Sequence, residues 1–157
     1  LVKPTKLITS DDINKVLSPS IYASLDISRL ACSSKIISPN SSIVFMSSVS
    51  SILGTSCMSL YSASKGAIDS LTRSLAIELA PRKVRVNTIV SGAVETPMHE
   101  NLSSLLTAEM LEDYRQRHPL GFGQPESVAS AVTFLLSDAS CWITGSQFII
   151  DGGYSAQ

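Results

Sequence analysis

The chain has 157 residues, a formal net charge of −1 at pH 7 and 44% hydrophobic residues. This length and apolar content predict one globular domain over residues 1–157. The near-zero charge gives no basic surface for nucleic acid, and no apolar run reaches the roughly 18–20 residues that a membrane-spanning helix needs. Three cysteines without Cys-x-x-Cys spacing, and no visible secretory signal, predict reduced thiols in a cytoplasmic protein.

The sequence contains no candidate metal site. Its two histidines, His99 and His118, are too few and too far apart for a zinc motif. We expect both of them to be solvated loop residues. A metal cofactor is therefore not expected, and any chemistry must come from other side chains.

Helices are predicted to come first along the chain. A short helix is expected to begin near Ser10, whose hydroxyl can cap it. A second helical stretch covers roughly residues 21–34, and Pro19 is expected to break or restart the helix before it. The apolar run at residues 43–46 is then typical of a buried parallel strand.

Tyr61 and Lys65 are the most informative pair in the chain. They lie four residues apart in a helix predicted over residues 60–79, so the phenol and the ammonium share one face. A free tyrosine has a pKa of about 10. A unit charge roughly 6 Å away, at an effective dielectric constant of about 20, contributes roughly 3 kcal/mol, which is about two pKa units. Such a tyrosine is a plausible general acid/base, although ordinary helices also carry this pair.

The surroundings of the pair favour a functional site. Ser48 lies thirteen positions before Tyr61 and directly follows the predicted strand, and strand ends are where sites form in open α/β sheets. Residues 84–90 predict the next strand, which runs into Ser91-Gly-Ala-Val-Glu-Thr. Residues 97–119 form a long polar insertion. Pro125 fits the first turn of a helix, and residues 148–150 predict a last strand. This alternation implies a parallel sheet covered on both faces.

Taken together, these segments resemble the C-terminal half of a short-chain dehydrogenase/reductase. The family pattern has a serine followed about thirteen residues later by Tyr-x-x-x-Lys, and then Pro-Gly-x-x-x-Thr. Residues 119–126 (Pro-Leu-Gly-Phe-Gly-Gln-Pro-Glu), 142–145 (Trp-Ile-Thr-Gly) and 148–153 (Phe-Ile-Ile-Asp-Gly-Gly) also match. The motifs are most similar to the branch that contains 3-oxoacyl-acyl-carrier-protein reductases. The resemblance implies part of a Rossmann-like, doubly wound parallel sheet.

The resemblance also implies a role for each matching residue. Ser48 would hydrogen-bond the substrate oxygen, and Tyr61 would transfer the proton. Lys65 would lower the tyrosine pKa and, with Tyr61, lie against the cofactor ribose. Three further residues match the loop that holds the nicotinamide carboxamide: Gly92, Val94 and Thr96. The implied cofactor is NADP(H) in preference to NAD(H), and residues 97–119 would form the substrate lid.

The sequence departs from the family pattern at several points. Ser91 replaces the usual proline, which loosens the turn, and Ser20 occupies the position of a common asparagine. No segment matches the glycine-rich loop, Thr-Gly-x-x-x-Gly-x-Gly, that supplies backbone N–H groups for the pyrophosphate. We therefore expect a fragment of a larger unit, with an unpaired sheet edge and a need for a partner.

Two functional hypotheses follow. The first is an NAD(P)(H)-dependent oxidoreductase that interconverts a carbonyl and a secondary alcohol on a small molecule or an acyl thioester. The alternative is a non-catalytic, truncated remnant or assembly fragment that cannot bind the dinucleotide alone. Under either hypothesis, the expected partner is a second copy of the chain, in a dimer or tetramer, or a missing N-terminal half.

Overall fold

A three-stranded parallel sheet forms the centre of the computed structural model, which describes residues 1–33, 36–104 and 106–157. Its strands are β1 (Ser42–Ser48), β2 (Arg85–Ser91) and β3 (Gln147–Ile150), in the order β1-β2-β3. Each strand connects to the next through a helix, as the parallel direction requires. The predicted α/β class and the three parallel strands are confirmed.

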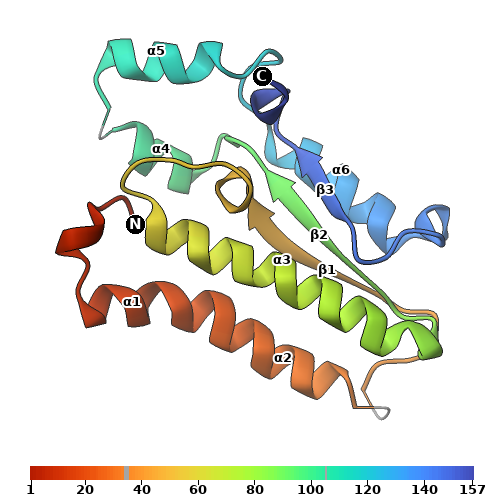
Figure 1. Ribbon diagram of the computed structural model, residues 1–157. Coiled ribbons are helices and arrows are strands. Elements are labelled where there is room, and N and C mark those ends of the chain that lie inside the picture. Colours follow the sequence, from red (N-terminus) through yellow and green to blue (C-terminus); the bar gives the residue numbers. More distant parts are fainter. Residues whose placement is uncertain (34–35, 105) are drawn as a thin grey trace.

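Helices cover both faces of this sheet (Figure 1). They are α1 (Ser10–Leu17), α2 (Ala23–Ala31), α3 (Ser59–Leu79), α4 (Pro97–Ser103), α5 (Ala108–Gln116) and α6 (Pro125–Leu136). Helix α3 packs on one face, with α1 and α2 beside it, and α6 packs on the other. Helices α4 and α5 lie beyond the ends of the strands (Figure 1). None of the helices in the described part of the chain is long and apolar enough to cross a membrane.

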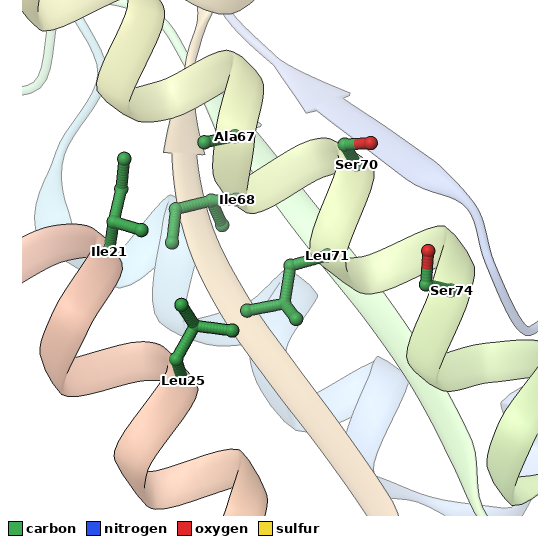
Figure 2. A pocket seen from close by; sticks show the side chains of 7 residues that line it. All are labelled: Ile21, Leu25, Ala67, Ile68, Ser70, Leu71 and Ser74. Carbon is green, nitrogen blue, oxygen red and sulfur yellow. The ribbon is translucent and has the colours of Figure 1, made fainter.

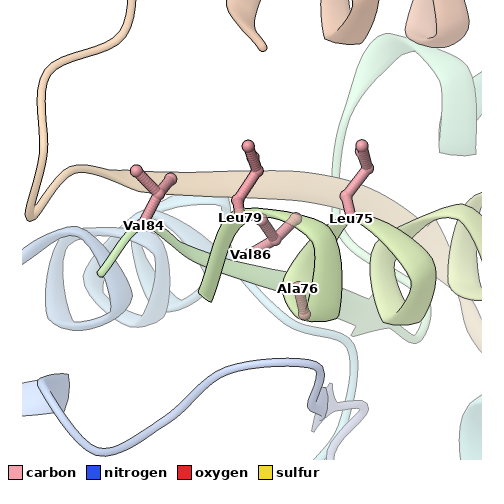
Figure 3. Close-up of a cluster of buried hydrophobic side chains, with 5 residues drawn as sticks. All are labelled: Leu75, Ala76, Leu79, Val84 and Val86. Carbon is pink, nitrogen blue, oxygen red and sulfur yellow. The ribbon is translucent and has the colours of Figure 1, made fainter. Parts of the chain in front are cut away.

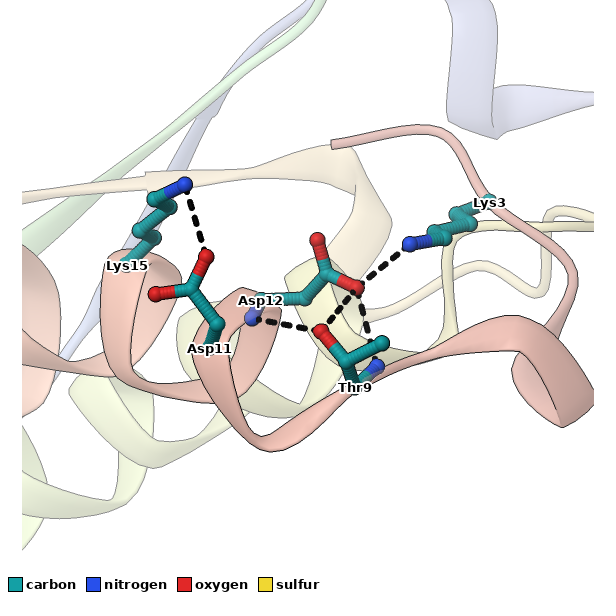
Figure 4. Close-up of polar contacts among 5 residues, drawn as sticks. All are labelled: Lys3, Thr9, Asp11, Asp12 and Lys15. Atoms are coloured by element: carbon teal, nitrogen blue, oxygen red, sulfur yellow. Dashed lines mark hydrogen bonds and ion pairs between the residues drawn. The ribbon is translucent and has the colours of Figure 1, made fainter.

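The start of α1 corrects one prediction. The cap is Thr9, not Ser10, because the Thr9 side chain accepts the Asp12 N–H while the Asp12 carboxylate accepts the Thr9 N–H, a reciprocal capping box. Lys3 also binds this carboxylate, with Nζ 2.5 Å from Oδ2 (Figure 4). The hydrogen bond from Lys3, followed by those from Thr9, holds the pKa of Asp12 far below its usual range.

Pro19 does not break the helical segment as predicted. Residues Ser18–Tyr22 form a π-helical turn that joins α1 to α2. A π turn widens the backbone locally, which lets the helix continue past a residue that has no N–H to donate. Helix α2 ends at Ala31, and the predicted end at residue 34 lies outside the described residues.

The core is built around the central strand β2. On one face, Leu75, Ala76 and Leu79 of α3 pack against Val84 and Val86 (Figure 3). On the other face, α6 contributes its buried residues against Ile89. Those residues are Ala131 and Leu135. Both faces of β2 are therefore covered by apolar helix side chains, and the strand also buries Asn87 and Thr88.

Strand β1 forms one edge of the sheet. It pairs with β2 along its length, and Met46 is 45% exposed. On the α3 face, an apolar hollow between α3 and the helical segment before it has a volume of about 310 Å³ (Figure 2). Its lining consists of Ile21, Leu25, Ala67, Ile68, Ser70, Leu71 and Ser74. This hollow contains aliphatic side chains and serine hydroxyls but no titratable group, so we assign the chemistry elsewhere.

Candidate active site

A cleft of about 870 Å³ opens where strands β1 and β2 end. Its volume lies in the range of about 300–1,000 Å³ that is typical of small-molecule sites. The structure brings every sequence-predicted site residue to the lining of this cleft: Ser48, Tyr61, Lys65, Gly92, Val94 and Thr96. Three separate segments contribute them, namely the end of β1, the first turns of α3 and the loop after β2.

Tyr61 and Lys65 lie side by side because α3 begins at Ser59, which places both within its first turns. The Lys65 ammonium is 5.7 Å from the centre of the Tyr61 ring, close to the separation assumed from helical spacing. Lys65 Nζ donates a hydrogen bond to the Met46 carbonyl on β1, at 3.1 Å. Burial lowers the pKa of Lys65, while the carboxylate of Asp69, one turn further along α3, opposes that shift.

Ser47 and Ser48 use their hydroxyls differently. Ser47 Oγ donates to the Lys65 carbonyl at 3.3 Å, and so ties β1 to the backbone of α3. Ser48 Oγ accepts the Ser50 N–H at 3.2 Å, and its own hydrogen faces Ser50 Oγ at 3.4 Å, which is longer than an ordinary O–H···O bond. The Ser48 hydroxyl therefore makes only a long contact as a donor, and it lines the cleft beside Ser50.

The loop after β2 is held tightly against the end of β3. The Gly92 N–H donates to the Ile150 carbonyl at 2.9 Å. A Cβ atom at Gly92 would lie 2.8 Å from the Cα of Asp151, so this close approach requires glycine. Ser91, in place of the family's proline, donates from Oγ to the Ser47 carbonyl at 3.4 Å. This contact links the ends of β1 and β2.

Further contacts fix the rest of this loop. The Gly123 N–H donates to the Ala93 carbonyl at 2.9 Å, and the Glu95 N–H donates to the Gly123 carbonyl at 2.9 Å. Thr96 Oγ1 donates to the Val94 carbonyl at 3.2 Å and accepts the N–H of His99 at 3.3 Å, at the start of α4. The loop that should meet the nicotinamide is therefore packed from both sides.

His118 overturns one prediction. We expected a solvated loop residue, but its side chain is 3% exposed. Its Nδ1 lies 2.9 Å from the Tyr114 carbonyl, its Nε2 faces the Ala93 N–H at 3.4 Å, and its ring stacks on Tyr154 with centroids 4.4 Å apart. The sequence carried one signal for this burial, since aromatic rings recur every four residues at Tyr114, His118 and Phe122.

His99 is also less solvated than expected. It lines the cleft, and its ring meets Phe122 edge to face at a centroid distance of 4.6 Å. Its Nε2 is buried and has no hydrogen-bond partner among the described residues. Tyr114 lines the cleft beside it, and burial, with smaller contributions led by Tyr154, raises the pKa of its phenol. Residues 97–119, the predicted lid, thus supply an aromatic wall to the cleft.

Ser20 takes no part in the cleft. Its hydroxyl donates to the Val16 carbonyl at 2.7 Å, inside its own helical segment, and Ser20 is not among the residues that line the cleft. A serine that bonds to the preceding turn has no hydrogen left for a water. Among the described contacts, Ser20 therefore does not take over the role of the asparagine that is usual at this position.

The cleft residues fit one end of a nicotinamide dinucleotide. An ammonium, a phenol and the hydroxyls of several serines face a loop with a close-packed glycine, which suits a ribose and a carboxamide. The pyrophosphate would need a glycine-rich turn at a helix N-terminus, and residues 1–157 contain no such motif. The fit therefore covers the nicotinamide and its ribose.

Comparisons with known proteins agree with this geometry. A family model described as enoyl-(acyl carrier protein) reductase matches residues 1–155. A tropinone reductase homolog from Arabidopsis thaliana is 38% identical over 154 residues, which are 98% of this chain and 58% of that protein. The 3-oxoacyl-(acyl-carrier-protein) reductase of Thermotoga maritima is 38% identical over 144 residues, which are 91% of this chain and 57% of that protein.

Solved structures give the same result. A short chain dehydrogenase family protein from Francisella tularensis superposes with a TM-score of 0.92 at 33% identity, covering all of this chain and 67% of that one. A 4-hydroxyisoleucine dehydrogenase mutant in complex with NADH and succinate gives a TM-score of 0.88 at 31% identity, covering 99% of this chain and 64% of the other. The protein therefore belongs to the short-chain dehydrogenase/reductase family. It spans somewhat more than half the length of the two relatives named above.

Proposed function

We propose that this chain forms the catalytic part of an NAD(P)(H)-dependent oxidoreductase that interconverts a carbonyl and a secondary alcohol. The observation that carries the proposal is the meeting of Ser48, Tyr61 and Lys65 in one cleft with the loop after β2. Relatives named as reductases and dehydrogenases support it. The cofactor, when bound, would supply the hydride chemistry, and the chain's own residues would supply positioning and proton transfer.

Each of these residues has a distinct part in the proposed mechanism. Ser48 holds the substrate oxygen through its hydroxyl, which would turn from its long contact with Ser50 Oγ. Tyr61 gives a proton to that oxygen during reduction and takes one during oxidation. Lys65 is anchored on the Met46 carbonyl, which holds its ammonium 5.7 Å from the centre of the Tyr61 ring. Gly92, Val94 and Thr96 present backbone and hydroxyl groups to the nicotinamide carboxamide.

The finer assignments extend this proposal. Residues 97–119 act as the substrate lid, since His99 and Tyr114 already line the cleft. The substrate is a small carbonyl compound or an acyl thioester, and NADP(H) is preferred over NAD(H), by similarity to the acyl-carrier-protein branch. The three cysteines are free thiols, which supports a location in the cytoplasm.

A partner completes the proposed unit. The partner covers the free edge of β1 or the exposed apolar side chains of α3 and β3, and is a second copy of the chain or an N-terminal half. Exposed aliphatic groups support this, since Ile77 on α3 is 77% exposed and Ile149 on β3 is 47% exposed. A dilute chain that is monomeric and well folded in ultracentrifugation would contradict this part of the proposal.

The competing function is a non-catalytic fragment that keeps the assembly surfaces but cannot hold the dinucleotide. One observation favours it, namely the lack of a glycine-rich loop in residues 1–157. The deciding experiment is a fluorescence titration of the folded chain, at a verified mass, with NADPH and with NADH. Saturable micromolar binding supports the oxidoreductase. No binding of either cofactor to folded protein supports the fragment and overturns cofactor binding by this chain alone.

A further inference from the structure

The two ring nitrogens of His118 face partners that allow only one protonation state. The Tyr114 carbonyl can only accept a hydrogen bond, so Nδ1, at 2.9 Å, must carry the proton. The Ala93 N–H can only donate, so Nε2, at 3.4 Å, must be bare. A charged imidazole would carry hydrogen on both nitrogens and turn the second contact into a clash of two donors. The arrangement therefore requires neutral imidazole.

The imidazole joins three segments that are distant in the sequence. The backbone carbonyl of His118 accepts the Gly121 N–H at 2.8 Å, in the turn before α6, and the Leu120 N–H of the same turn donates to the Gly152 carbonyl at 3.0 Å. The ring stacks on Tyr154 in the turn after β3. Ala93, which meets Nε2, lies directly after Gly92 in the cofactor-facing loop. One buried ring thus connects this loop to the lid helix α5 and to the C-terminal turn.

Charged and titratable groups surround the ring from each neighbouring element. Tyr114 of α5 meets it edge to face at 5.0 Å, and Arg117 lies 5.1 Å from the Tyr154 ring. The Asp151 carboxylate is close enough to interact with a charged imidazole, but its hydrogen bonds come from Gly153 and Ser155. On the loop side, Glu95 lies two residues after Ala93 and accepts a hydrogen bond from Gln124. Arg115 lies 4.7 Å from the Phe122 ring, which meets His118 edge to face. A charged imidazole would interact favourably with Asp151 but would lose the contact with the Ala93 N–H.

We propose that His118 is a positioning residue whose neutral imidazole holds the loop at residues 92–96 in its cofactor-facing shape, and that protonation of Nε2 releases this loop. The effect on cofactor affinity rests on the proposed function, whereas the effect on the loop itself does not. Histidine is the side chain that ordinarily changes charge between about pH 5 and 8. Cofactor affinity should therefore fall as the pH is lowered through that range.

The first experiment reads the ring directly, without cofactor. Long-range proton–nitrogen correlation NMR on the chain identifies which ring nitrogen carries hydrogen, and His99→Gln assigns the signals because the chain has two histidines. At pH 8 we expect hydrogen on Nδ1 of His118. The Ala93 amide should be protected from hydrogen exchange at pH 8, and its protection, corrected for intrinsic exchange rates, should fall as the ring becomes charged. Hydrogen on Nε2, or protection that ignores the ring charge, would overturn the proposal.

Two substitutions separate the hydrogen bonds from the packing of the ring. His118→Phe keeps an aromatic ring against Tyr154 but has no acceptor, so we expect the Ala93 amide to lose roughly three- to tenfold of its protection, the worth of one ordinary hydrogen bond. His118→Gln supplies an acceptor that does not titrate, so protection should survive and no longer depend on pH between 5 and 8. A His118→Gln chain as pH-sensitive as the wild type would show that another group is the switch.

Cofactor titration at pH 8 and pH 5.5 completes the test. The wild-type dissociation constant for NADPH should rise roughly three- to tenfold at the lower pH, while that of His118→Gln should not change. If neither protein binds NADPH at pH 8, the proposed cofactor function fails for this chain, and the amide-exchange result still decides the role of His118. If both bind and both respond equally to pH, the proposed function stands and the role of His118 is overturned.

Discussion

Helix α3 buries polar side chains near its N-terminal end and aliphatic side chains near its C-terminal end. In the first half, Ser64 is 1% exposed and Asp69 is 2% exposed, beside the cleft residues Tyr61 and Lys65. In the second half, Leu79 is 3% exposed and packs into the core beneath β1 and β2. The same helix therefore carries the candidate chemistry at one end and the stabilising core at the other. Substitutions in the two halves should separate activity from stability.

The substitution Tyr61→Phe tests most directly whether the N-terminal half of α3 carries the chemistry. Loss of the phenolic hydroxyl should lower turnover about 100- to 10,000-fold, the usual contribution of a general acid/base. The free energy of unfolding should change by less than about 0.5 kcal/mol, as for substitutions away from the core. Steady-state kinetics with a carbonyl substrate and urea denaturation measure the two effects. Tyr22→Phe, at a tyrosine that is 53% exposed, is the matched control. Full turnover by the Tyr61→Phe variant would remove Tyr61 from the mechanism.

At the other end of the helix, Leu79→Ala should act on stability. Truncating a buried leucine leaves a cavity and lowers the free energy of unfolding by about 2–5 kcal/mol. Ile77→Ala lies two residues away on the same helix, and the Ile77 side chain is 77% exposed, so we expect almost no change in the isolated chain. Equal losses of unfolding free energy for both variants, measured by urea denaturation, would show that the burial of Leu79 in the core does not determine the stability contributed by this half of α3.

The turn after β3 contains a stabilising set of hydrogen bonds to the Asp151 carboxylate. Burial alone would raise the pKa of Asp151, but hydrogen bonds from the Ser155 side chain and from the Ser155 and Gly153 amides hold the pKa below its usual range. A depressed carboxyl pKa stabilises the fold above the usual value of about 3.9, and this stabilisation is lost as the pH falls through the lowered pKa.

Asp151→Asn should therefore cost about 1 kcal/mol at pH 7, and the difference from wild type should shrink as the pH falls below about 4. Urea denaturation at a series of pH values between 7 and 3 measures this change. Asp138→Asn, at an exposed aspartate in the turn after α6, is the control. A difference from wild type that stays constant over this range would mean that the Asp151 charge is not involved.

The smallest expected effect on stability is at Lys65. Burial lowers its pKa, so the charged ammonium is less stable in the fold than in the unfolded chain. That penalty is present below the lowered pKa and disappears as the pH rises toward about 10.4, the value for a free lysine. Lys65→Met should therefore leave the free energy of unfolding at pH 7 unchanged or raised by less than about 1 kcal/mol, with turnover abolished.

Thermal denaturation of Lys65→Met at pH 7 and pH 10 checks the direction of this change in stability. Any stabilisation relative to wild type should be larger at pH 7. A clear loss of stability at pH 7 would show that the hydrogen bond from Lys65 Nζ to the Met46 carbonyl outweighs the cost of burying the charge. The two ends of α3 would then both stabilise the fold.

Sequence reasoning located the candidate site because its signals are local. Helical spacing places Tyr61 beside Lys65. The ends of the predicted strands place Ser48 and Gly92 together at the carboxyl end of the sheet. His118 escaped prediction because its burial depends on the packing of three distant segments, and the spacing of aromatic rings around it indicates an aromatic face without indicating what covers that face. The same holds for Pro19, since a proline ordinarily breaks a helix and the π turn depends on its surroundings.

The close contact between Gly92 and the turn at Asp151 sets an order of events in folding. The loop after β2 emerges from the ribosome well before the residues that lock it, because Ile150 and Asp151 follow the whole of α6 in the sequence. Strand β3 must also find β2 across that long crossover, which is a slow, non-local step. During synthesis, Tyr61 and Lys65 therefore leave the ribosome before the residues that hold the loop on the other side of their cleft.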